Sequence, residues 1–235
     1  MAQSKRKAAE QQRLAEKRKQ QNKLILLTVA IGVAIIALVV GLVYGLGGKK
    51  DKEVPIEGFS PSEEVTNYVR LNITYTDKKG KEHTGDVIVE LDPETAPITV
   101  ENFQNLVKSD FYDGLTFHRI IKGFMIQGGD PKGTGLGGSG QNIKGEFRAN
   151  GVENNISHTR GVISMARNSQ SYNSASSQFF IVHQDSPHLD GDYAAFGHVV
   201  YGMETVDGVA NVTTNSSDKP LNAVKLNYAT FVTKN

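Results

Sequence analysis

The chain has 235 residues, 38% hydrophobic and 22% charged, a balance that permits a folded core and excludes a largely disordered protein. Its formal net charge of +1 conceals an asymmetry, since residues 1–48 carry eight Lys or Arg and two Glu, a charge of +6, which leaves −5 for the rest. A domain of that sign has no overall attraction for nucleic acid, and the absence of cysteine excludes disulfides, thiol catalysis and thiolate metal sites.

Residues 24–46, LILLTVAIGVAIIALVVGLVYGL, form an uncharged run long enough to span a hydrocarbon core of about 30 Å. We predict a transmembrane anchor there, preceded by a basic tail at residues 1–23. A cleaved signal peptide is the alternative, but this run exceeds the usual length of roughly 7–15 residues, and charged residues 49–52 follow it instead of a small-residue cleavage site. The positive-inside rule places the N-terminus in the cytoplasm and the remainder outside a single-pass cell membrane protein. An oligomer is not indicated.

Residues 47–66 mix charge, proline and glycine without periodicity, which predicts a linker, and the folded domain is expected at residues 67–235. Two alternating segments flank a turn signal at residues 77–80 and predict a β-hairpin. Their apolar positions are Val69, Leu71, Ile73 and Tyr75 in the first segment, and Val87, Val89 and Leu91 in the second.

A helix is predicted after Pro97, with Thr99 as a plausible N-cap, because apolar residues then recur at a spacing of three and four. A second helix is predicted at residues 203–212. Short β-type runs follow the first helix at residues 124–126, 161–165 and 178–182, separated by loops rich in Gly, Ser and Asn. Many short strands with few helices indicate a barrel or a sandwich.

Three motifs of known function are either absent or lack the surroundings that they require. Residues 133–138 match Gly-x-Gly-x-x-Gly, but no βαβ unit surrounds them, so a flexible glycine loop is the better interpretation than a dinucleotide site. Six histidines are scattered without a metal-ligand spacing, and Ser164 lacks the Gly-x-Ser-x-Gly elbow of serine hydrolases. The sequence therefore predicts neither a metal nor a cofactor.

Two stretches carry a more specific signal. They are FHRIIKGFMIQGGD at residues 117–130, and SQFFI at 177–181 followed by LDG at 189–191 and FG at 196–197. In this order and spacing they resemble the cyclophilins, from about Asn67 to the end of the chain, and we expect a membrane-anchored, bacterial-like member. The resemblance implies a mainly β fold, an eight-stranded antiparallel closed β-barrel capped by two α-helices, with a peptide groove on its outer surface.

The resemblance also implies a peptidyl-prolyl cis/trans isomerase with Arg119 as its catalytic residue. His188 stands where many eukaryotic members have Trp, and Tyr193 where many have His, so both departures affect the rim of the pocket. The substrate-binding residues implied by the matching motifs are Phe124, Met125, Gln127, Ala166, Arg167, Gln178, Phe180, His188, Leu189 and Tyr193.

The expected partners are proline-containing unfolded or nascent extracytoplasmic proteins, whose folding the enzyme would assist near the membrane. Rotation about an X–Pro bond makes and breaks no covalent bond, so neither a nucleophile nor a cofactor is required. A peptide-binding or holding chaperone with incidental isomerase activity is the alternative function. An adhesin that uses the domain as a scaffold is a third possibility, for which no sequence feature argues.

Overall fold

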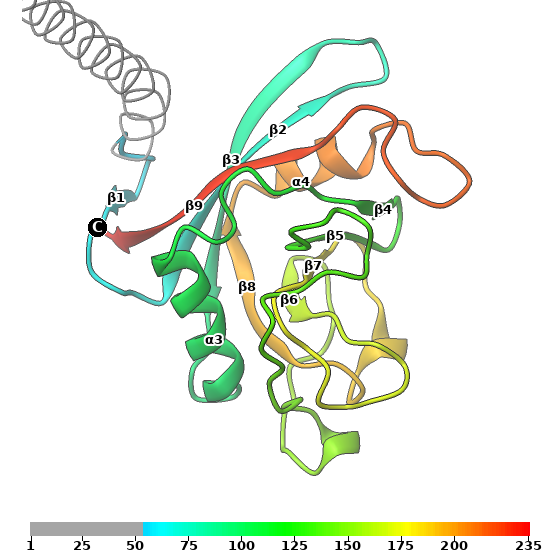
Figure 1. Ribbon diagram of the computed structural model, residues 1–235. Helices are drawn as coiled ribbons and strands as arrows, with labels where there is room; N and C mark the ends of the chain where they lie inside the picture. Colours follow the sequence, from blue (N-terminus) through cyan, green and yellow to red (C-terminus); the bar gives the residue numbers. More distant parts are fainter. Residues whose placement is uncertain (1–53) are drawn as a thin grey trace, which may run out of the picture. The chain divides into compact units, whose positions relative to one another are not determined.

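A computed structural model describes residues 54–235 of the chain (Figure 1). The basic tail, the membrane helix predicted at residues 24–46 and the first part of the predicted linker lie outside the described residues. Within residues 54–235, no helix is both long and apolar enough to cross a membrane. The described residues belong to one compact unit, Lys52–Asn235.

In the described part of the chain, a single sheet of nine antiparallel strands forms the framework, in the order β1-β9-β2-β3-β8-β6-β7-β5-β4. The hairpin predicted from alternation is confirmed as β2 and β3. The strands are β1 (Phe59–Pro61), β2 (Tyr68–Thr76), β3 (Glu82–Leu91), β4 (Arg119–Ile121), β5 (Met125–Gly128), β6 (Val162–Met165), β7 (Phe179–Val182), β8 (Ala195–Tyr201) and β9 (Lys225–Lys234).

The predicted barrel of eight strands is correct in its mainly β content but not in its closure. The sheet has nine strands, and β1 and β4 remain at its edges. The segment before β4 contacts β9 and the residue before it through one isolated bridge, Thr116 to Lys225, and a few backbone hydrogen bonds. Among these, the Leu226 N–H donates to the Leu115 carbonyl at 2.8 Å, and the Phe117 N–H to the Val224 carbonyl at 3.0 Å. β4 is three residues long, too short to continue this contact as a ladder.

The segment predicted as a linker contributes the ninth strand. β1 pairs with β9 through Ser60 and Thr233. Phe59 is 6% exposed and packs in a small apolar cluster with Ile88 and Val232. Phe59 stands among Gly, Ser and Pro residues with no alternation to detect, so this pairing is decided by burial against distant strands.

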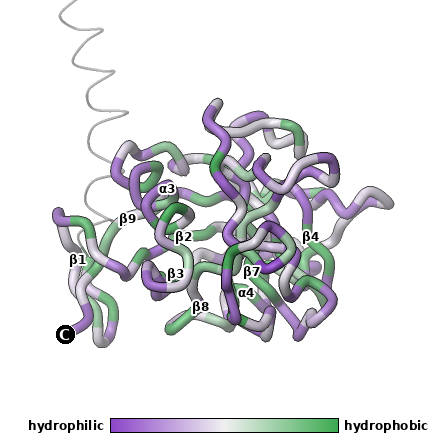
Figure 2. Tube along the Cα trace, turned by 90° about the horizontal axis from the view of Figure 1, so that it is seen from below, coloured by the Kyte–Doolittle hydropathy of each residue, from purple (hydrophilic) through white to green (hydrophobic). Residues whose placement is uncertain are grey.

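Two α-helices are present among residues 54–235, as predicted: α3 (Pro97–Lys108) and α4 (Met203–Ala210). Two 3-10 turns, η1 (Arg148–Asn150) and η2 (Pro187–Leu189), lie in the long loops. Figure 2 shows hydrophilic residues prevailing in the outer loops and hydrophobic residues in the strands between them. The main core lies between the sheet and the helices, with Phe103, Tyr112 and Phe179 at its centre.

The predicted N-cap of α3 is wrong. Ala96 occupies the cap position without a side-chain bond, and Thr99 lies inside the first turn. The helix is instead capped from a distant loop by the buried carboxylate of Glu146. It accepts hydrogen bonds from the Ile98 N–H at 3.1 Å, and from the Thr99 N–H and hydroxyl at 2.7 Å each. The cap is therefore a tertiary contact that local sequence does not show.

Candidate active site

The hairpin of β4 and β5 places Arg119 on the outer face of the sheet. Arg119 pairs with Gln127 across the two strands, and Ile121 pairs with Met125. The turn between the strands contains Gly123 with φ of 83°, a backbone conformation that disfavours residues with a side chain. The Gly123 N–H donates to His183 Nδ1 at 3.0 Å, which ties this turn to the end of β7.

The alternation of strand side chains separates the site from the core. Phe179 points into the main core, whereas its neighbour Phe180 points to the outer face, where it pairs in register with Gln127. Phe180, Met125 and Leu189 are 5%, 2% and 7% exposed and form an apolar cluster of their own. This second cluster is the floor of the site.

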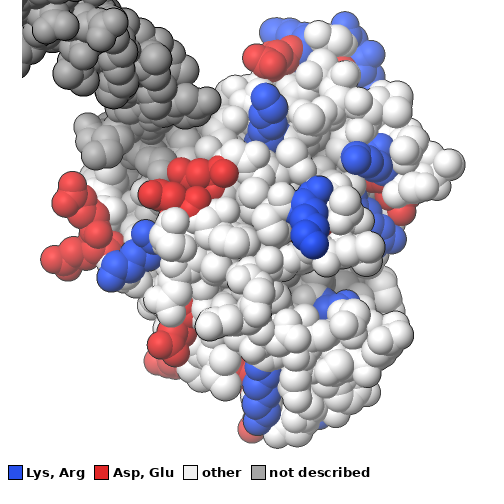
Figure 3. All heavy atoms as spheres, viewed as in Figure 1, with Lys and Arg blue, Asp and Glu red and all other residues white. Residues whose placement is uncertain are grey.

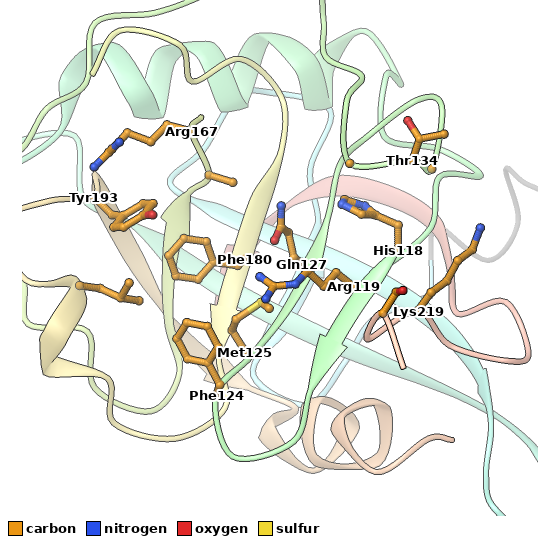
Figure 4. Close-up of a pocket in the computed structure, with 15 residues that line it drawn as sticks. His118, Arg119, Phe124, Met125, Gln127, Thr134, Arg167, Phe180, Tyr193 and Lys219 are labelled. Carbon is orange, nitrogen blue, oxygen red and sulfur yellow. The ribbon is translucent and has the colours of Figure 1, made fainter. Parts of the chain in front are cut away.

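A cavity of about 520 Å³ opens above this floor (Figure 4). It brings together nine of the predicted site residues, so the two sequence stretches converge on one pocket. Gln178 and His188 do not line this cavity and lie beside it. The lining residues are His118, Arg119, Phe124, Met125, Gln127, Gly133, Thr134, Gly135, Ala166, Arg167, Phe180, Leu189, Tyr193, Ser217 and Lys219.

Arg119 reaches into the cavity between Gln127 and Met125 (Figure 4). Its side chain is 44% exposed, and its Nε lies 3.4 Å from Oδ2 of Asp218 in the loop before β9. The same loop holds the start of β4, because the Ile120 N–H donates to the Asp218 carbonyl at 2.8 Å. Asp218 thus fixes both the strand and one side of the guanidinium, leaving the remaining N–H groups for a substrate.

Gln178 links the site to the glycine-rich loop. Its side-chain carbonyl accepts a hydrogen bond from Gln127 Nε2 at 2.9 Å. Its amide donates to the carbonyls of Gly135 and Gly137 at 3.0 and 2.8 Å. The predicted groove residue therefore orients Gln127 and the loop wall from the adjacent hollow, which it lines.

Arg167 and Tyr193 form one side of the rim. The Arg167 Nε donates to the Asp192 carbonyl at 2.9 Å, and its guanidinium lies 4.8 Å from the Tyr193 ring centroid. Tyr193 in turn meets Phe180 edge to face, at 5.9 Å between centroids. His188, on η2, is exposed and lies 5.3 Å from the Phe124 ring. These contacts place both predicted rim departures at the edge of the apolar floor.

A buried polar chain supports the floor from below. His158 Nδ1 lies 2.9 Å from Asp190 Oδ1, its Nε2 lies 3.0 Å from the Ser164 hydroxyl, and its ring stacks on Phe180. The order of Ser, His and Asp resembles that of hydrolases, but Ser164 is fully buried and cannot meet a substrate. This hydrogen-bonded chain of side chains therefore holds the Phe180 ring in place.

Three partly or fully buried histidines should make the fold acid-sensitive. Burial is the largest cause of a lowered pKa at His118, His158 and His183. Below about pH 6.5 these histidines bind protons in the unfolded chain but remain neutral in the native state. The stability they contribute is therefore present above that pH and is lost as the pH falls through their pKa values in the folded state.

We expect the urea midpoint to decrease between pH 7.5 and pH 5.5. The lowered pKa values of Asp130, Asp190 and Asp207 act only below this window. His198→Asn, at an exposed position, is the control and should keep the pH dependence of the parent chain. An equal or higher midpoint at pH 5.5 would contradict the expectation.

Several pocket residues escaped sequence reasoning. His118 directly precedes Arg119, and Gly133, Thr134 and Gly135 belong to the loop interpreted only as flexible. Ser217 and Lys219 come from the loop before β9, about 100 residues from β4 in the sequence, where only turn signals are visible. Within residues 54–235, no group of three or more His, Asp or Glu could hold a metal ion.

Comparison with known proteins identifies the fold and the family. Residues 74–230 match the family "Cyclophilin type peptidyl-prolyl cis-trans isomerase/CLD". Peptidyl-prolyl cis-trans isomerase CYP18-1 of Arabidopsis thaliana is 44% identical over 148 residues, covering 63% of this chain and 90% of that protein. Peptidyl-prolyl cis-trans isomerase B of Bacillus subtilis is 48% identical over 122 residues, covering 52% and 81%.

A solved structure gives the same result. The crystal structure of a Cryptosporidium parvum cyclophilin-type isomerase, in the presence of the dipeptide Ala-Pro, superposes with a TM-score of 0.58 at 33% identity, covering 70% of this chain and 99% of that one. The family match spans more than half of the chain and includes both sequence stretches that line the pocket. The chain belongs to the cyclophilin-type peptidyl-prolyl cis-trans isomerases.

Proposed function

We propose that this isomerase rotates X–Pro bonds of extracytoplasmic proteins as they fold, using Arg119 as its catalytic residue. The observation that carries the proposal is the position of the Arg119 guanidinium above an apolar floor of Phe180, Met125 and Leu189. Both features suit a substrate proline. Its ring is apolar, and its imide nitrogen becomes pyramidal during rotation and can then accept a hydrogen bond.

The chemistry follows from the barrier to rotation, about 18–20 kcal/mol for a planar amide. In the twisted transition state the proline nitrogen becomes pyramidal and regains its lone pair. A guanidinium N–H can then donate a hydrogen bond that the planar ground state cannot accept, which is stabilisation specific to the transition state. One such charged bond contributes about 1.5–3 kcal/mol, so Arg119 lowers the barrier only in part.

The pocket supplies the rest of the effect. Phe180, Met125 and Leu189 would hold the proline ring while the preceding carbonyl turns, and a site shielded from water favours the less polar twisted amide. Gln127, oriented by Gln178, would bind the substrate backbone. The Ala166 N–H donates to the Gln178 carbonyl, which fixes the backbone of Ala166 and of the adjacent Arg167. This segment would form a rigid wall beside an extended peptide.

The proposed clients are unfolded or nascent proteins outside the cytoplasm, reached from a membrane anchor at residues 24–46. The uncharged length of this segment and the basic residues before it support this assignment. His188, in place of the Trp of many eukaryotic members, supports a bacterial-like type. Plant and Bacillus relatives have similar identities and favour neither origin.

Protease treatment of intact cells tests the orientation. A tag placed after Asn235 should be lost from intact cells that express the full chain, because the isomerase domain would lie outside. A cytoplasmic protein of the same cells should survive as the control. A tag protected until the cells are lysed would contradict the proposed topology.

A further inference from the structure

The wall of the cavity opposite Tyr193 is basic and polar. His118, Arg119, Thr134 and Lys219 line it, while the apolar floor lies on the other side (Figure 4). Ser217, from the same loop as Lys219, also lines the cavity. Among the residues that line the cavity within the described chain, four carry basic side chains and none is acidic. Figure 3 shows Lys and Arg on the side of the molecule with β4 and the loop before β9, and most acidic side chains nearer β1.

His118 is a buried polar side chain directed toward the cavity. It is 8% exposed, and neither ring nitrogen has a hydrogen-bond partner within residues 54–235. Burying a polar group without a partner is costly, so native structures usually supply one. The imidazole thus offers an N–H donor that no group of the described chain uses.

The carboxylate that interacts electrostatically with His118, that of Asp130, already has other hydrogen-bond partners. Asp130 raises the pKa of the imidazole, but burial lowers it more, and Arg119 and Lys219 lower it further. The Asp130 carboxylate accepts hydrogen bonds from the backbone N–H groups of Lys132, Thr134 and Gly135 at 2.6–2.9 Å. It holds the glycine loop in place and leaves His118 unpartnered.

Lys219 brings an unmatched charge to the same wall. No carboxylate within residues 54–235 lies within 4 Å of its ammonium, and its neighbour Asp218 is paired with Arg119. The loop backbone is fixed, because Asn215 accepts from the Lys219 N–H at 3.0 Å and donates its own N–H to the Lys219 carbonyl at 2.8 Å. Pro220 follows and restricts the loop further.

We propose that His118, Thr134, Ser217 and Lys219 form a subsite for the carboxylate of an Asp or Glu residue that flanks the substrate proline. The inference rests on the proposed function and deepens it, since the subsite adjoins Arg119. One ammonium without a carboxylate partner matches the single charge of a side-chain carboxylate. The imidazole N–H and the Ser217 hydroxyl offer neutral donors to its oxygens, and the Thr134 hydroxyl, which donates to Asp130 Oδ2 at 3.5 Å, would turn from that long bond to join them.

The test compares proline peptides that differ only in one residue beside the X–Pro pair, either Glu, Gln or Lys, placed in turn before and after it. With the full-length chain, we expect kcat/KM for the Glu peptide to exceed that for the Gln peptide by about fivefold at one of the two positions. The preference should shrink in about 0.5 M salt, because part of the attraction is screened.

Variants of Lys219 and Lys132 test which side chain causes the preference for the Glu peptide. Lys219→Gln should bring the Glu-to-Gln ratio to about one, and Lys219→Glu should favour the Lys peptide. Lys132, whose side chain does not line the cavity, is the matched control, and Lys132→Gln should keep the parent ratio. The ratio is read within each variant, so a change in overall rate does not obscure it.

The outcomes separate this inference from the isomerase assignment. If the parent chain turns over the Gln peptide but shows no preference for Glu at either position, the acidic subsite is refuted and the proposed function stands. An equal loss of ratio in the Lys219 and Lys132 variants would also refute it, because a diffuse field would then explain the preference. No turnover of any peptide would refute the proposed function itself.

Discussion

Replacing Arg119 by alanine is expected to lower kcat/KM for a neutral proline peptide by about 100-fold. In the proposed mechanism the guanidinium hydrogen bond is made only in the transition state and contributes about 1.5–3 kcal/mol, at about 1.4 kcal/mol for each factor of ten. The apolar floor remains, so peptide binding should change far less than kcat. NMR exchange measurements, which follow the interconversion of the cis and trans peptide directly, give both the rate of isomerisation and the affinity for the peptide.

Two further variants define the role of Arg119. Arg119→Lys should remain at least about tenfold impaired, because an ammonium lacks the planar fork that addresses the nitrogen and the carbonyl together. Arg148→Ala, at an exposed arginine on η1, is the matched control and should behave like the parent chain. Equal rates for the parent and Arg119→Ala would refute the mechanism.

The same variant separates isomerisation from holding. A chain with Arg119→Ala that no longer isomerises peptides but still prevents aggregation of an unfolded protein would show that the holding function is independent of catalysis. Loss of both activities would indicate that they share the pocket.

Replacing Glu146 by alanine should give the largest loss of stability, about 4 kcal/mol. The carboxylate is 2% exposed and accepts three hydrogen bonds from the first turn of α3. Its removal leaves the buried N–H and hydroxyl of Thr99 without partners, each at about 1–3 kcal/mol, and also removes the bond from the Ile98 N–H, which lies at an exposed residue and can bond water instead. Urea unfolding followed by tyrosine signals measures this, since the chain has eight Tyr and no Trp.

Two comparisons isolate the capping effect. Glu146→Gln keeps a carbonyl acceptor but loses the charge near the helix N-terminus, so about half of the loss is expected. Glu101→Ala, at an exposed acid on the same helix, should change the free energy of unfolding by less than about 0.5 kcal/mol. A loss at Glu146 no larger than at Glu101 would contradict the proposed cap.

Local patterns determined the elements with strong periodicity. The alternation around Val69 and Val87 predicted the hairpin, and the spacing of Val100 and Phe103 predicted α3, because both patterns express burial of one face. The two stretches, at residues 117–130 and 177–197, pointed to the family, and the resemblance named nine residues that line one pocket. The role of each residue, the membrane anchor and the linker boundary remain predictions.

Contacts between distant segments required the tertiary structure. Glu146 caps a helix that begins 49 positions earlier in the chain, at Pro97. From another loop, Asp218 pairs with Arg119, and Lys219 lines the same cavity. The failure of the sheet to close likewise depends on the segment before β4, which contacts β9 by one isolated bridge and not by a ladder. Sequence periodicity records which side of an element is buried, but it contains no information on which remote polar group satisfies a helix end or balances a charge. The sequence by itself therefore determined the family and the apolar floor, and only the folded chain decided the polar wall around Arg119.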